Sequence, residues 1–154
     1  MERQLRKNQD TLYISGMAVI AFGLWSIVKG ILSSLAADGY LATIGLDPEN
    51  KALLVATFVL LALILAAGIF VRIKVGIGAV NEARGDKRGY GYIIVAACLF
   101  IPSSAAGIFS YVTENAMTSA NIVAILVEAT SMAATIEMIV SALKVKKLTR
   151  EKEG

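Results

Sequence analysis

The sequence lacks histidine and has a single cysteine, Cys98. Without histidine, the chain has neither the side chain that most often carries protons near neutral pH nor the commonest metal ligand. Because Cys98 has no second cysteine to pair with, an intrachain disulfide and a CxxC redox pair are excluded. These absences argue against metalloenzymes and triad hydrolases. We therefore predict no catalytic residues, no metal site, no cofactor and no enzymatic activity.

Long apolar segments are what the sequence has instead. Apolar residues make up 56% of the 154 residues, and the mean hydropathy is +0.68. A helix needs about 20 residues to cross a hydrocarbon core of ~30 Å. Four segments reach that length: residues 11–35, 52–73, 90–112 and 122–143. Backbone polar groups in lipid must be paired within the segment, which predicts helices rather than open strands.

The fold class that follows is an all-α integral membrane protein. We predict that residues 1–154 form a single domain of four transmembrane helices. Because the connections are short, consecutive helices should be antiparallel neighbours in a bundle. The first apolar run is too long for the hydrophobic region of a cleaved signal peptide, so we expect it to remain as a helix. In the second connection, residues 81–86 are expected to form a solvated loop.

Basic residues gather on one side of the predicted spans and set the orientation. Thirteen of the fifteen lysines and arginines fall before the first span, at the end of the second or between the second and third, or after the fourth. The other side carries Asp38, Asp47, Glu49 and Glu114 against Lys51 alone. Because basic residues stay on the cytoplasmic side, both termini should be cytoplasmic. We expect a multi-pass protein of a bacterial plasma (inner) membrane whose basic face meets anionic lipid headgroups, with no nucleic-acid partner.

Small residues form a stripe on the first predicted helix. Gly16, Gly23 and Gly30 are seven residues apart, which is close to two helical turns. Small residues let helix backbones approach closely in lipid. The stripe could face the second helix, the fourth helix or another copy of the protein. Assembly as a homo-oligomer, or with a partner membrane protein, is therefore expected.

The third predicted helix is interrupted near its middle by Pro102, Ser103 and Ser104. Pro102 has no N–H to donate to the carbonyl of Cys98, so a kink is expected there. A serine hydroxyl could pair with the freed carbonyl. The kink could serve packing alone, or it could form a hinge or polar opening at mid-membrane depth. The second helix, in contrast, is nearly uniform in apolar residues and is expected to face lipid.

Ionisable residues inside a membrane are costly and face an interior, a partner or water. Three are candidates here: Lys29, Glu128 and Glu137. Lys29 and Glu128 each lie about six residues, or ~9 Å, below the predicted outer boundary, so they could pair. Ser131 and Thr135 share the face of Glu128 and extend a polar stripe along the fourth helix.

Glu137 is nine residues after Glu128, about half a turn out of phase, so the two carboxylates point to opposite faces. They do not form a paired acid/base dyad. Arg72 and Lys144 lie near the predicted inner boundary and could reach Glu137 by bending inward. The charges could therefore be pinned pairs that fix the packing, or one glutamate could bind a proton or another cation.

The function predicted from these residues is a small channel or transporter subunit. It would pass a small ion, proton or solute, with Glu128, Lys29 and Glu137 as candidate transport residues. The alternative is a non-catalytic accessory or structural subunit that docks on other membrane proteins. A channel or carrier needs a continuous polar stripe on two helices. The fourth helix has such a stripe, and the third has a short one near Ser103 and Ser104.

Overall fold

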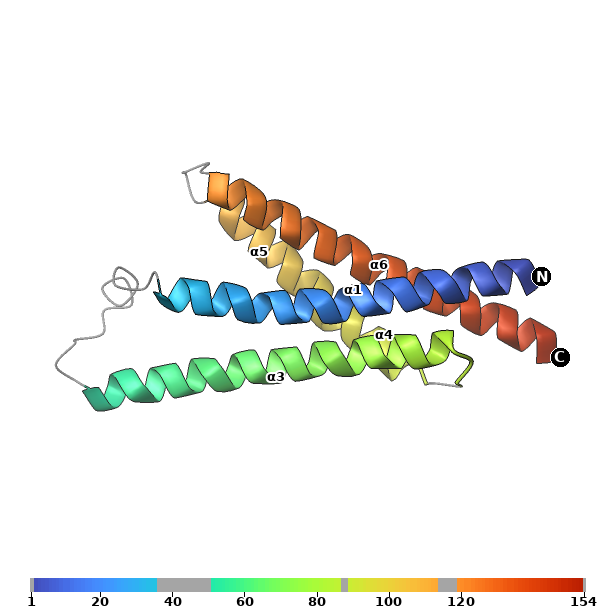
Figure 1. Ribbon diagram of the computed structural model, residues 1–154, viewed down its shortest axis with the longest axis horizontal. Coiled ribbons are helices and arrows are strands. Elements are labelled where there is room, and N and C mark those ends of the chain that lie inside the picture. The colour runs from blue at the N-terminus through green and yellow to red at the C-terminus, as the bar shows by residue number, and fades with distance from the viewer. Residues whose placement is uncertain (1, 36–50, 87–88, 114–118, 154) are drawn as a thin grey trace.

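The computed structural model describes residues 2–35, 51–86, 89–113 and 119–153. Within these ranges the side chains of residues 26–35, 51–54, 58, 61, 119–121 and 153 lie outside the description. The elements are α1 (Glu2–Leu35), α3 (Lys51–Ala83), α4 (Gly91–Val95), the π-helix η1 (Ala96–Phe100), α5 (Ile101–Thr113) and α6 (Ser119–Glu153) (Figure 1). The described residues contain no strand, which confirms the predicted all-helical class.

Three of the described helical segments are long and apolar enough to cross a membrane. They are Val55–Ala83, Gly91–Thr113 and Ile122–Lys152, and they contain most of the second, third and fourth predicted spans. These segments suggest a membrane protein. The first predicted span, residues 11–35, lies in α1, but the side chains of its second part are outside the description. Its crossing of the membrane stays a prediction.

The helix α3 continues beyond the end predicted from the sequence. We expected a loop from residue 74, but α3 runs to Ala83. It ends where Gly85 adopts a positive φ of 102°, a conformation that glycine reaches without steric cost. The N–H of Gly85 donates to the carbonyl of Glu82 at 3.0 Å, and the N–H of Asp86 donates to that of Asn81 at 3.1 Å. This pair of bonds is the Schellman pattern, so the glycine marks the helix end.

The two ends of the chain lie at the same end of the molecule (Figure 1). The helix α1 begins at Glu2 and α6 extends to Glu153, so both helices continue past the predicted apolar spans. Lys152 Nζ lies 3.2 Å from Glu2 Oε1, which places the last turn of α6 beside the first turn of α1. Away from the termini, α5 and α6 diverge from α1 and α3 (Figure 1).

The buried apolar core lies in the half of the molecule near the termini. It joins side chains of α1, α3, α4, η1 and α6: Leu12, Val19, Val75, Ala79, Ile93, Ala96, Phe100, Met138, Ala142 and Val145. The helix α1 packs against both α3 and α6, and α5 packs against α6. In contrast, none of the described side chains at 55–70 of α3 is buried. The core therefore positions the C-terminal half of α3 against the rest of the chain.

Glycines allow α1 and α3 to approach closely. A Cβ added at Gly76 would lie 2.8 Å from the carbonyl oxygen of Gly16, and one at Gly16 would lie 3.0 Å from Cβ of Ala79. A Cβ at Gly23 would meet Cβ of Arg72 at 3.1 Å. In the described part of the predicted stripe, Gly16 and Gly23 thus face α3 of the same chain. Gly30 lies outside the described side chains.

A kink was expected at Pro102, and the structure has a π-helix just before it. The turn from Ala96 to Phe100 is η1, and α5 starts at Ile101. A π-helical turn widens the backbone ladder, which accommodates a proline without ending the helix. Ser103 Oγ donates to the carbonyl of Phe100 at 3.0 Å. This bond gives one carbonyl near the proline a side-chain donor.

Candidate functional site

A cluster of polar side chains lies between the helices, and Arg72 of α3 is its positive charge. Arg72 Nη1 donates to Ser131 Oγ of α6 at 3.3 Å. The guanidinium also lies over the ring of Phe100 in η1, 4.9 Å from the ring centroid. The first carbons of the Arg72 side chain pack against Gly23 of α1. Contacts with three other helices therefore hold Arg72 toward the interior.

Glu128 of α6 supplies the negative charge of the same cluster. Its carboxylate interacts electrostatically with the Arg72 guanidinium. Its side chain also approaches α5 at Gly107, where an added Cβ would lie 3.6 Å from Glu128 Cγ and 3.7 Å from Cδ. The cluster thus holds one positive and one negative charge among apolar helices, where a lone charge would be costly.

Ser104 of α5 adds a hydroxyl without a partner. Its side chain is 2% exposed, and among the described residues its Oγ has no hydrogen-bond partner. Ser104 is four residues after Phe100 and three before Gly107, so all three share one face of the third membrane segment. Phe100 touches Arg72 and Gly107 touches Glu128. The unpaired hydroxyl therefore lies on the face that meets both charges.

This arrangement can do two things chemically. The carboxylate of Glu128 can take up a proton, which would remove the negative charge opposite Arg72. The guanidinium offers five N–H donors, and the hydroxyls of Ser131 and Ser104 can donate or accept. A water molecule or a small ion that enters the cluster would find both donors and acceptors. A buried hydroxyl without a partner is uncommon and is often explained by such a guest.

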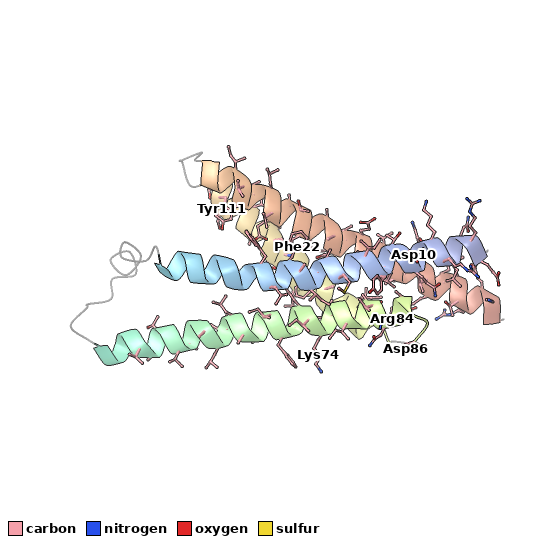
Figure 2. The ribbon with its side chains drawn as sticks, viewed as in Figure 1. Asp10, Phe22, Lys74, Arg84, Asp86 and Tyr111 are labelled. Carbon is pink, nitrogen blue, oxygen red and sulfur yellow. The ribbon has the colours of Figure 1, made fainter. Side chains whose placement is uncertain are left out.

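The second predicted helix was expected to face lipid, but it also places one polar side chain in the interior. The helix α3 contributes Arg72 to the interior, where it donates to Ser131 and interacts electrostatically with Glu128. Glu137 lies on another face of α6 and lines the groove against α1. Lys74, two residues after Arg72, points away from the other helices (Figure 2). The two residues are a little more than half a turn apart, so one faces inward when the other faces outward. The useful sequence signal was that Arg72 interrupts an apolar run that continues beyond it.

Some of the remaining predicted pathway residues lie in or beside the cluster, and others lie away from it. Thr135 is buried one turn from Ser131, and its Oγ1 donates to the Ser131 carbonyl at 2.9 Å. Pro102 and Ser103 are exposed and lie on a different face from Ser104. The structure thus places Ser131 and Glu128 near Arg72, and Ser104 on the helix face that meets Arg72 and Glu128. It does not bring Pro102 and Ser103 to them.

Glu137 and Lys29 lie elsewhere. The side chain of Glu137 is exposed and lines an open groove between α1 and α6. This position agrees with the expectation that Glu137 and Glu128 point to opposite faces. Lys29 belongs to α1, but its side chain is outside the described residues, so the expected pair between Lys29 and Glu128 stays a prediction.

A buried ion pair lies nearer the termini, where a solvated loop was predicted. Glu82 is 5% exposed, and both of its carboxylate oxygens lie 2.8 Å from Lys146 Nζ of α6. The Tyr92 hydroxyl donates to Glu82 Oε2 at 2.8 Å, and Lys146 Nζ lies 4.9 Å from the Tyr90 ring centroid. Glu82 is buried because α3 continues past the predicted boundary. The bonds tie α3, α4 and α6 together, and we interpret the pair as structural.

Comparison of the chain with family models, with curated proteins and with solved structures finds no match. The site is therefore interpreted from its own geometry.

Proposed function

We propose that the chain crosses the membrane four times as an antiparallel bundle with both termini in the cytoplasm. Three segments of suitable length and hydropathy support this topology. The helix α1 packs against both α3 and α6 and would be the remaining membrane-spanning helix. Both ends of the chain lie at one end of the molecule (Figure 1). Basic residues lie before the apolar part of α1 and after the apolar part of α6, and both groups fall at this end. This is the arrangement that the positive-inside rule requires for the cytoplasmic side.

Within this topology, we propose that the protein carries a proton or another small ion across the membrane, as a subunit of a small channel or transporter. The observation that supports this role is the cluster of Arg72, Glu128, Ser131 and Ser104. Ser131 is nine residues after the predicted outer boundary at residue 122, which is ~14 Å into a hydrocarbon core of ~30 Å. Charged residues at such depth usually mark an ion or proton pathway.

A proton fits the cluster better than a metal cation does. A proton adds to the Glu128 carboxylate without needing the space next to the Arg72 guanidinium. A metal cation would have to bind beside a fixed positive charge, and like charges repel strongly where water is scarce. Protonation also leaves Arg72 without its counter-charge, which favours a different arrangement of the helices. The pair can therefore link the binding of a proton to a change in packing.

Proton flux into proteoliposomes tests the proposal directly. The purified full chain is reconstituted, and acidification of the lumen is followed with a pH-sensitive dye under an imposed potential. We expect flux in the wild type and a loss of at least about tenfold in Glu128→Gln, because the amide cannot take up a proton. The matched control is Glu151→Gln, the same change on an exposed part of the same helix. It should keep the wild-type rate.

Two outcomes would count against this role. One is an absence of wild-type flux for protons, sodium, potassium and chloride in vesicles that contain the folded protein. The other is equal flux in the wild type and in Glu128→Gln. Gel filtration in detergent establishes that each variant is folded before the flux is compared.

One observation favours a second candidate, an accessory subunit that docks on another membrane protein. The described side chains at 55–70 of α3 include many exposed apolar ones, with Val55 61% exposed, Leu63 62% and Phe70 61%. Lipid can cover such a surface, and so can a partner helix. Stable expression of the chain alone, together with flux, would favour the transporter. A chain that is lost from the membrane unless another protein is present would favour the subunit.

A further inference from the structure

An open groove runs along the outer side of α1 and α6, on the face of α6 opposite the Arg72 cluster. Its volume is about 1040 Å³. Lys7, Asn8 and Thr11 line it from α1. Ile136, Glu137, Val140, Ser141, Lys144 and Lys147 line it from α6. These α6 residues recur every three or four positions and so form one face of the helix.

The polarity of this α1/α6 groove changes along its length. Lys7, Lys144 and Lys147 lie outside the predicted apolar spans, which begin at residue 11 and end at residue 143. Ile136 and Val140 lie inside the span of α6. Under the proposed topology, the lysines are level with lipid headgroups, and the apolar side chains are level with the acyl chains. Glu151 also lines the interface part and lies 3.9 Å from Lys147, so the three lysines leave this part with a net positive charge. A single groove therefore passes from a part of net positive charge at the interface to an apolar part in the hydrocarbon.

We propose that the α1/α6 groove binds one anionic phospholipid from the cytoplasmic leaflet. The lysine ammonium groups would hold the phosphate, and Ile136 and Val140 would contact an acyl chain. A soluble anion would match the lysines but would leave the apolar part unused. Lysines near the surface of the cytoplasmic leaflet attract anionic lipids. This inference rests on the membrane topology proposed above, but not on proton flux.

Glu137 provides a test of the ligand's charge, because its carboxylate faces the apolar part of the groove. It is seven residues before Lys144, or ~10 Å deeper along the helix. A cationic ligand would bind against Glu137, whereas an anionic lipid would be repelled by it. The substitution Glu137→Gln therefore separates the two ligand classes. It should strengthen the binding of an anionic lipid, and it should weaken the binding of a lipophilic cation.

The experiment measures lipid binding to the purified full chain in detergent by native mass spectrometry. Phosphatidylglycerol and phosphatidylcholine with identical acyl chains are the probes, with inorganic phosphate as the soluble anion. The test variant is Lys7→Gln, Lys144→Gln and Lys147→Gln combined. The control variant is Arg3→Gln, Lys74→Gln and Arg84→Gln combined, which removes the same charge from exposed residues outside the groove. Figure 2 shows Lys74 on α3, pointing away from the other helices, and Arg84 follows the last residue of α3.

We expect the wild type to retain phosphatidylglycerol in preference to phosphatidylcholine. The groove variant should lose about 10- to 100-fold in affinity for phosphatidylglycerol, since each lysine contributes to the attraction. The control variant should change by less than about threefold. Glu137→Gln should bind phosphatidylglycerol more tightly, and Glu128→Gln should bind it as the wild type does. The last result keeps the lipid site separate from the proposed transport site.

Several results would overturn the proposal. Equal losses in the groove and control variants would mean that the attraction depends on total charge. Displacement of the lipid by millimolar inorganic phosphate would indicate a soluble-anion site. Weaker phosphatidylglycerol binding in Glu137→Gln would contradict the assigned ligand charge. A wild-type dimer that the groove variant converts to a monomer would show that a second copy occupies this face.

Discussion

Removal of the Lys146 ammonium group should strongly destabilise the fold. Lys146→Met keeps most of the aliphatic length but leaves the Glu82 carboxylate buried without its cation. The side chains are 12% and 5% exposed, and two oxygen contacts of 2.8 Å join them. Breaking a buried ion pair from one side costs about 3–5 kcal/mol. For a chain of this size, that loss corresponds to a fall in Tm on the order of 10 °C.

The neighbouring lysine provides the control. Lys147 is 78% exposed and lies 3.9 Å from Glu151, which is 44% exposed. An exposed pair of this kind contributes about 0–1 kcal/mol. Lys147→Met should therefore leave Tm within a few degrees of the wild type. Thermal unfolding in detergent, followed by circular dichroism or by gel filtration after heating, measures both variants under the same conditions.

A double-mutant cycle gives the reasoning its strictest test. When Glu82→Leu is combined with Lys146→Met, no unpaired charge remains, and apolar replacement of a whole buried pair is often neutral or stabilising. The double variant should therefore be more stable than Lys146→Met alone. Equal Tm values for Lys146→Met and Lys147→Met would refute the burial argument. If the double variant loses as much stability as the two single variants together, Glu82 and Lys146 do not stabilise each other, and the pairing argument is refuted.

Two further predictions concern helix packing and the polar cluster. Gly76→Ala should destabilise the protein by about 1–3 kcal/mol, because the new Cβ would lie 2.8 Å from the Gly16 carbonyl oxygen and the helices would have to separate. Gly68→Ala, where nothing lies within 4 Å, should be neutral or slightly stabilising in the same Tm measurement. Ser104→Ala should change stability by no more than about 1 kcal/mol, because its hydroxyl has no partner among the described residues. It should nevertheless slow proton flux several-fold, and an unchanged rate would remove Ser104 from the pathway.

Much of the fold could be predicted from the sequence because its signals are local. The apolar runs predicted four spans, and the described residues contain three helical segments that are long and apolar enough to cross a membrane. Pro102 predicted a kink, and the π-helix η1 lies just before it. The end of α3 was placed too early, although Gly85 lies directly after it. The boundary of an apolar run shows where lipid burial ends, whereas the glycine shows where the helix ends.

The candidate site was only partly predictable. The sequence identified Glu128, Ser131 and Ser104 as polar residues in apolar helices, but it offered Arg72 only as a possible partner of Glu137 and did not predict its hydrogen bond to Ser131. Arg72 and Ser131 are 59 positions apart, and no local pattern states which of two helix faces meets a distant residue. Glu82 was missed for the same reason, since its partner Lys146 is 64 positions away.

The sequence by itself determined that the chain is helical and rich in membrane-length apolar segments, because these properties depend on the hydropathy and backbone preferences of neighbouring residues. It also determined that Glu128 and Glu137 point apart, because the helical repeat fixes their relative angle. Only the tertiary structure decided which charges are paired. A charge is stabilised in an apolar interior only when an opposite charge from another helix reaches it, and the packing of α3 against α1 and α6 decides which one does.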